Sequence, residues 1–343
     1  MKILVTGTDG YIGVLLAGVL LKRGHDVAGL DTGFYRDGLL YDGLELPRRL
    51  VRKDVREVAD EDVAGLDAVV HLAELSNDPL GQHNPQLTYA INHRGSVALA
   101  ERSKRAGVRR FVYSSSCSVY GVASGNAVAE ESPTNPQTAY ATCKALVERD
   151  VSAMADDGFS PTFLRNATAF GASPRMRFDI VLNNLAGLAF TTREIKMVSD
   201  GTPWRPLVHV LDICEAIGCA LEAPREMVHN QVLNVGDNGQ NYRVKEIAEC
   251  VAEAFPGCAL SFGRNDGDNR SYRVSFDKIH QVLPGFRCRR DARTGAHELR
   301  EVFERIKLTR EMFEFRGFTR LKQLEHLLHT QQIDEQFFWK NRP

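Results

Sequence analysis

The chain has 343 residues, of which 43% are hydrophobic and 25% charged, and its formal net charge is -1 at pH 7. This ordinary globular composition lacks the basic excess of nucleic-acid-binding proteins and any apolar run long enough for a membrane span, so we expect neither partner. Seven scattered cysteines without a CxxC pair argue against a disulfide framework and favour a reducing cytoplasm. The length predicts two lobes with a cleft between them.

The first half alternates short β-branched runs with stretches of helical periodicity, which is typical of βαβ units on a parallel sheet. Strands are expected at 2–5, 26–30, 50–53, 68–72, 110–113 and 162–164, and helices at 11–23, about 92–106 and about 139–154. The rhythm changes after Gly171. We therefore predict an α/β fold with a Rossmann-type doubly wound parallel sheet, formed by 1–170 and about 207–237. A smaller α/β lobe would comprise about 171–206 and 238–343, and its leucine stripe at 321–328 indicates core or interface.

Glycines at the end of the first strand mark a candidate cofactor site. Gly7, Gly10 and Gly13 have GxxGxxG spacing and open the first helix, where backbone N–H groups and the helix dipole favour a diphosphate. Asp31 ends the second strand, where a carboxylate accepts hydrogen bonds from an adenosine ribose and repels the 2′-phosphate of NADP. NAD is therefore the expected cofactor. Asp54 could flank the adenine or simply form a turn, whereas His71 is expected to be structural.

Tyr140 and Lys144 lie four residues apart on a predicted helix and therefore on one face. A phenol has an unperturbed pKa of about 10, and a nearby ammonium favours its ionised form. Tyr140 thus becomes a usable proton acceptor. Ser116 follows the fifth strand in a serine-rich segment and could share and orient the same proton. The YxxxK pattern alone would indicate only a solvated helix face, but the glycines, Asp31 and Ser116 make it a candidate active site.

Together with Arg205 to Asp212, these motifs resemble the extended short-chain dehydrogenases/reductases, specifically the nucleotide-sugar epimerase/dehydratase family of UDP-galactose 4-epimerase type. The resemblance implies an NAD-binding Rossmann domain, a nucleotide-sugar-binding lobe, no metal, and a homodimer formed by the helices near 92–106 and 139–154. The expected catalytic residues are Ser116, Tyr140 and Lys144. The expected cofactor-binding residues are Gly7, Gly10, Tyr11, Ile12, Gly13, Asp31, Asp54, Val55, Leu72, Ala73, Asn92, Ser114, Tyr140 and Lys144. The expected substrate-binding residues are Ser76, Ser116, Cys117, Ser118, Thr168, Asn183, Arg205 and Arg270.

Two departures from the family pattern narrow the implied reaction. Dehydratases of the family have an Asp-Glu pair after the catalytic Ser/Thr, whereas this chain has Cys117 and Ser118, which argues against 4,6-dehydration. Glu74 or Cys143 would be an unusual substitute acid. Thr168 stands where the family has an asparagine, and Asn166 directly follows Arg165, so the placement of the substrate differs there.

Three functions fit these residues. The first is an NAD-dependent nucleotide-sugar 4-epimerase, which oxidises C4 and reduces the transient 4-keto sugar from its opposite face. The second is a 4-dehydrogenase or 4-ketoreductase, which releases or consumes the keto sugar. The third is a non-catalytic NAD-binding sensor, against which the joint presence of Ser116, Tyr140 and Lys144 argues.

Overall fold

The computed structural model of the chain describes residues 1–43, 45–76, 84–123, 125–197, 199–263 and 271–341. Its centre is a seven-stranded sheet with the order β10-β6-β5-β4-β1-β2-β3, in which every neighbouring pair is parallel. The strands are β1 (Lys2–Thr6), β2 (Asp26–Asp31), β3 (Arg49–Arg52), β4 (Ala68–His71), β5 (Arg110–Ser116), β6 (Ser160–Asn166) and β10 (Gln231–Val235). This order confirms the predicted Rossmann-type doubly wound sheet. The chain adds β2 and β3 on one side of β1 and then continues on the other side with β4, so the strand order reverses between β1 and β4.

Both faces of the sheet are covered, because successive strand side chains point to opposite sides. Ile3 and Val5 face a core cluster containing residues of α1 (Gly13–Lys22), α8 (Val210–Glu222) and α11 (Asp277–Val282). Leu4 faces another cluster, which contains residues of α5 (Ser96–Arg105) and α6 (Ala139–Ser152). Shorter helical segments on this part of the chain are Val55–Glu57, α2 (Asp60–Val63), α4 (Pro85–Thr88), a π-helical segment at Tyr89–Gly95, Cys117–Tyr120 and α9 (Arg225–Val228).

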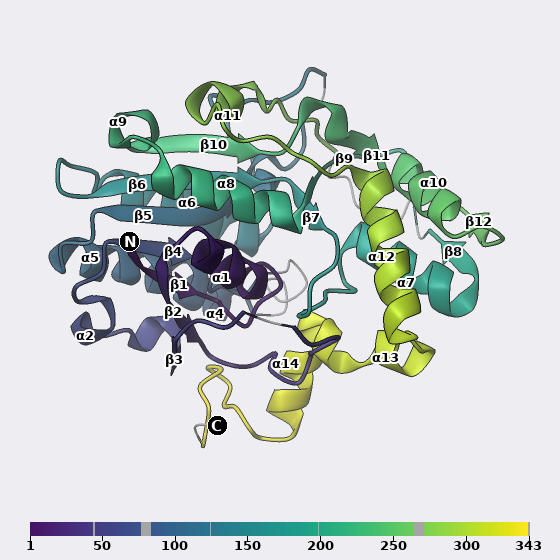
Figure 1. The fold of residues 1–343 in the computed structure, drawn as a ribbon, viewed down its shortest axis with the longest axis horizontal. Coiled ribbons are helices and arrows are strands. Elements are labelled where there is room, and N and C mark those ends of the chain that lie inside the picture. Colours follow the sequence, from purple (N-terminus) through teal and green to yellow (C-terminus); the bar gives the residue numbers. More distant parts are fainter. Residues whose placement is uncertain (44, 77–83, 124, 198, 264–270, 342–343) are drawn as a thin grey trace.

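The remaining elements form a second group at the right of Figure 1. They share a hydrophobic cluster of their own, which includes Leu182, Ile247 and Leu299. The helices are α7 (Val181–Thr192), α10 (Val244–Ala254), α12 (Ala292–Ile306) and α13 (Arg310–Glu314). One small sheet joins β7 (Thr168–Phe170), β9 (Trp204–His209) and β11 (Asn241–Arg243), and another joins β8 (Glu194–Lys196) and β12 (Ala259–Ser261). The lobe boundaries expected from the sequence stay a proposal.

The last described helix, α14 (Arg320–His329), contacts the segment that follows β2, where Gln323 Nε2 donates to the Phe34 carbonyl (2.8 Å). Its Leu324 and Leu327 are buried in the same cluster as Leu4, Phe34 and Val55. The leucine stripe read from the sequence is therefore core. No helix in the described ranges is both long and apolar enough to cross a bilayer.

His71 has the structural role expected for it. Its Nδ1 lies 2.7 Å from the Thr6 hydroxyl and its Nε2 lies 2.7 Å from the Ser96 hydroxyl. The Ser96 hydroxyl donates to the carbonyl of Asn92, so it accepts from Nε2, and Thr6 donates to Nδ1. Both ring nitrogens therefore have a hydrogen-bond partner when the imidazole is neutral and carries a single proton, on Nε2. The ring is fully buried, and its burial lowers the pKa of His71 to about 3.

We predict that protonation of His71 contributes to acid unfolding. An unfolded histidine gains a proton below pH ~6.5 while the folded one does not, so the free energy of unfolding should fall by up to about 1.4 kcal/mol per pH unit below that value. Urea unfolding at about pH 7.5 and about pH 5 would measure this slope. The variant His71→Gln should be less stable at both values but show a shallower slope; an identical slope would contradict the assignment.

Candidate active site

A cavity of about 710 Å³ opens at the carboxyl ends of β1, β2, β4 and β5 and extends to the second group of elements. This is the position at which doubly wound sheets bind ligands, because the strand order reverses there. Most site residues predicted from the sequence line it. From the cofactor set these are Gly7, Gly10, Tyr11, Ile12, Gly13, Asp31, Asp54, Val55, Leu72, Ala73, Ser114, Tyr140 and Lys144; from the substrate set they are Ser76, Ser116, Ser118, Thr168 and Arg205.

The glycines form a tight turn between β1 and α1. Gly7 has φ +78°, which favours glycine, and a Cβ at Gly13 would overlap the carbonyl oxygen of Gly7. A Cβ at Gly10 would lie 3.0 Å from that same oxygen. Tyr11, Ile12 and Gly13 line the cavity, so the beginning of α1 faces the space in which a diphosphate would bind.

Asp31 extends this half of the cavity from the end of β2. Its Oδ2 accepts a hydrogen bond from Asp9 N (2.9 Å) and its Oδ1 accepts one from Gly33 N (2.7 Å). Burial and the neighbouring Asp9 raise the pKa of this carboxyl to about 6. Asp54 also lines the cavity, but it accepts from Arg56 N (2.8 Å) and pairs with the Arg56 guanidinium, as a turn residue would.

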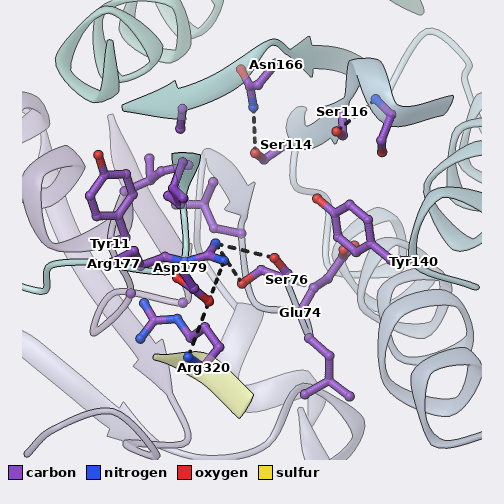
Figure 2. Close-up of a pocket in the computed structure, with 18 of the residues that line it drawn as sticks. Tyr11, Glu74, Ser76, Ser114, Ser116, Tyr140, Asn166, Arg177, Asp179 and Arg320 are labelled. Atoms are coloured by element: carbon purple, nitrogen blue, oxygen red, sulfur yellow. Dashed lines mark hydrogen bonds and ion pairs between the residues drawn. The ribbon is translucent and has the colours of Figure 1, made fainter. Parts of the chain in front are cut away.

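Tyr140 and Lys144 enter the cavity from the first turns of α6. Thr138 caps this helix by accepting from Ala141 N (3.2 Å). Lys144 is buried, donates to the carbonyl of Ser114, and its Nζ lies 5.4 Å from the centre of the Tyr140 ring. Figure 2 shows Tyr140 with Ser114 and Ser116 on one side of the cavity. The helical spacing predicted this juxtaposition.

Glu74 is the partner of Lys144, with 2.8 Å between Oε2 and Nζ. Its Oε1 also accepts from the Tyr113 hydroxyl at 2.5 Å. Burial raises the pKa of Glu74 although Lys144 opposes this effect. Burial also disfavours the Lys144 ammonium, but the carboxylate of Glu74 outweighs it and raises the pKa of Lys144. The sequence suggested Glu74 as an unusual acid, whereas its carboxylate holds the ammonium.

Polar atoms at the ends of β5 and β6 also line the cavity. The Ser116 hydroxyl accepts a hydrogen bond from Ser118 N (3.1 Å), and this bond stabilises the turn after β5. Asn166 Nδ2 donates to the Ser114 hydroxyl (2.9 Å). Within the part of the chain that the structure describes, the buried Asn166 Oδ1 and Ser118 Oγ have no hydrogen-bond partner. Both atoms are positioned for a ligand, and Asn166 lies beside Thr168 at the family's altered position.

Three predicted residues have their side chains behind the wall of the cavity. Asn92 is fully buried and bonds both backbone groups of Leu75 (2.8 and 2.9 Å). Cys117 begins the short helical turn that follows Ser116, and its Sγ donates to the Arg165 carbonyl (3.1 Å). Asn183 accepts from Gly171 N (3.0 Å) and donates to the Tyr11 hydroxyl (3.2 Å). These three support the site without lining it. Arg270 lies outside the described residues.

Several lining residues were missed by the sequence analysis. They come from separate segments, and no motif joins them: Phe34, Tyr35, Asp179, Tyr272 and Arg320. Arg177 lines the cavity as well and was likewise not predicted. Figure 2 shows Arg177, Asp179, Ser76 and Arg320 side by side on the cavity wall.

Known proteins share this architecture. Residues 3–236 match the NAD dependent epimerase/dehydratase family. The UDP-glucose 4-epimerase of Corynebacterium glutamicum is 31% identical over 303 residues, which cover 82% of this chain and 90% of the relative. That of Lactobacillus helveticus is 31% identical over 309 residues, covering 82% and 91%.

Solved structures agree. MoeE5 in complex with UDP-glucose and NAD superimposes with a TM-score of 0.76 at 29% identity, covering 90% of this chain and 100% of that one. The UDP-glucuronic acid 4-epimerase from Bacillus cereus has the same fold, with a TM-score of 0.77 at 22% identity, covering 89% and 100%. The chain therefore belongs to the NAD-dependent epimerase/dehydratase family and has the extended short-chain dehydrogenase/reductase architecture that its motifs resemble.

Proposed function

We propose that this enzyme is a 4-epimerase of UDP-sugars that acts through a transient 4-keto intermediate. One observation carries the proposal: Tyr140 and Lys144 line the same cavity as the glycine turn and Asp31. A proton acceptor and a dinucleotide site therefore open onto a common space. The two relatives named UDP-glucose 4-epimerase support this choice of reaction and nucleotide.

The residues present fit NAD. The glycine turn at Gly7, Gly10 and Gly13 has no room for a Cβ and lines the cavity at the beginning of α1, where a diphosphate would bind, and Asp31 would accept from the adenosine ribose. Lys144 would hold the nicotinamide ribose. When bound, NAD supplies a hydride acceptor that later returns the hydride.

The chain's own groups move and orient the proton. Tyr140 would accept the proton of the sugar C4 hydroxyl, with the Lys144 ammonium favouring the resulting phenolate. Ser116 would share that proton through its hydroxyl. After the keto sugar has turned, Tyr140 would return the proton to the C4 oxygen. The unpartnered Asn166 Oδ1 and Ser118 Oγ, with Thr168 and Arg205, would bind the substrate.

The alternative is a 4-dehydrogenase or 4-ketoreductase, in which the keto sugar leaves or enters. The two are separated by incubating the enzyme with UDP-glucose or UDP-galactose and measuring both products and NADH absorbance. An epimerase should interconvert the two sugars without net NADH, whereas steady NADH growth would contradict the proposal. A thermal-shift screen with UDP-, dTDP-, GDP-, CDP- and ADP-sugars in the presence of NAD would identify the base, because ligands stabilise the state they bind.

Replacing Tyr140 by Phe should remove the proton acceptor but leave the cavity intact. We predict that kcat falls by about 100-fold to 10,000-fold while NAD affinity stays within a few fold of the parent value. Turnover by coupled assay and NAD titration by calorimetry would measure the two effects. Unchanged turnover of every accepted nucleotide sugar would exclude Tyr140 as the acceptor.

Replacing Glu74 by Gln should move the alkaline limb of the activity profile to lower pH. The Glu74 carboxylate raises the pKa of Lys144, so without it burial prevails and the ammonium loses its proton earlier. Stability should also fall by about 3–5 kcal/mol, because a buried charge loses its partner. The double variant Glu74→Gln/Lys144→Met should recover stability but not activity. Superimposable pH profiles of parent and Glu74→Gln would refute this coupling.

Binding of NAD should weaken in acid through Asp31. Its pKa of about 6 means that the carboxyl becomes neutral below that value, and a neutral carboxyl is a poorer acceptor for ribose hydroxyls. The NAD dissociation constant should therefore increase about tenfold between about pH 7 and about pH 5. Asp31→Asn should bind weakly and with little pH dependence. A constant affinity of the parent protein over this range would show that Asp31 does not take the ribose.

Assembly and location follow as proposals from the family. We propose a cytoplasmic homodimer that packs α5 and α6 against their counterparts. Val97 on α5 and Leu146 on α6 are only partly buried in the single chain, which supports a role for these helices in packing. Light scattering would give the mass in solution.

A further inference from the structure

Arg320 is the first residue of α14 and lines the cavity. Its side chain is almost fully inaccessible, at 3% exposure, and its guanidinium carbon lies 3.8 Å from the centre of the Tyr35 ring. Tyr35 in turn follows Asp31 by four residues at the end of β2. Arg320 is thus held against the segment that follows the predicted ribose carboxylate.

No carboxylate contacts the guanidinium of Arg320 within the described ranges. Its guanidinium makes no hydrogen bond or ion pair there; only its backbone N–H donates, to Asp179 Oδ2 at 3.4 Å. Asp179 already binds the neighbouring Arg177 through two oxygens, at 2.9 and 3.1 Å. Burial, with Arg177 adding repulsion, lowers the pKa of Arg320 to about 10. Asp179 and Asp31 attract this charge, but neither carboxylate contacts the guanidinium. A buried cation without a contacting anion is costly, which indicates an anionic ligand at this point of the cavity.

The contacts of the two arginines locate that anion along the cavity. Arg320 lies on the ring of Tyr35, four residues after Asp31, and Arg177 donates to the carbonyl of Ser76 (3.3 Å), two residues after the Glu74 that holds Lys144. The charges of Asp31 and Tyr140 also act on Arg320 and Arg177, respectively. The pair therefore lies between the carboxylate expected to bind the adenosine ribose and the tyrosine expected beside the nicotinamide. In a dinucleotide spanning these two points, the group in between is the diphosphate. The beginning of α1 lines the same cavity and also favours a diphosphate.

We propose that Arg320, supported by Arg177, binds the diphosphate of NAD, so that the C-terminal helix α14 retains the cofactor. The guanidinium fork matches phosphate oxygens bidentately, while Arg177 is held in place by Asp179 and by Ser76. This inference rests on the NAD site of the proposed function but not on the reaction. A nucleotide sugar also contains a diphosphate, so the two sources have to be separated by experiment.

The test compares the parent protein, freed of copurifying dinucleotide, with Arg320→Met and Arg320→Lys by calorimetry. Arg320→Met should weaken NAD and ADP-ribose by about 10-fold to 100-fold, and adenosine, which lacks phosphate, by less than about twofold. Arg320→Lys, which keeps the charge but not the fork, should lie in between. Affinity for UDP should not change. Because binding is measured directly, the result is independent of whether 4-epimerisation is the reaction.

The exposed Lys322 on the same helix provides the matched control, and Lys322→Gln should leave NAD affinity unchanged. Without NAD, Arg320→Met should melt at the same or a higher temperature than the parent, since it removes an unpaired buried charge, whereas the stabilisation by added NAD should shrink. The proposal is overturned if NAD affinity of Arg320→Met stays within about twofold of the parent. It is also overturned if UDP weakens more than NAD, or if the variant fails to fold.

Discussion

The buried ammonium of Lys144 is the interaction on which the active site depends. It joins the end of β4 through Glu74, the end of β5 through the Ser114 carbonyl, and α6, which carries it. A second buried pair on the same helix, Glu148 with Arg165 at 2.7 Å, ties α6 to β6. Removal of one partner from such a pair leaves an uncompensated charge. The position of Tyr140 is therefore set by charges that tolerate little displacement of α6.

This arrangement also limits how strongly Lys144 can act on Tyr140. A carboxylate beside the ammonium keeps it protonated but reduces the positive potential that the phenol experiences. Glu74 thus makes the site robust towards alkaline pH and at the same time weakens the promotion of the phenolate.

The sequence predicted those parts of the site that depend on local spacing. Each of these parts lies within one short stretch of the chain: the glycine turn between a strand and a helix, Asp31 at the end of a strand, and Tyr140 with Lys144 on one helix. The structure brings all of them into one cavity. Asn92, Cys117 and Asn183 were assigned from the family pattern, but their side-chain directions depend on partners such as Leu75, the Arg165 carbonyl and Gly171. Arg320 and Tyr35 could not be paired from the sequence, because nearly the whole chain separates them and only tertiary packing of α14 joins them.

The cavity wall contains Gly7 and Arg320, which stand close to opposite ends of the sequence. During synthesis the glycine turn and the first strands emerge early, while α14 emerges only after all seven strands of the large sheet have been made. Leu324 and Leu327 belong to the same buried cluster as Phe34 and Val55, so this cluster is incomplete until α14 has been made. Completion of the cluster is consequently a late event of folding, and a ribosome-bound chain that stops short of α14 leaves part of this apolar surface exposed to chaperones.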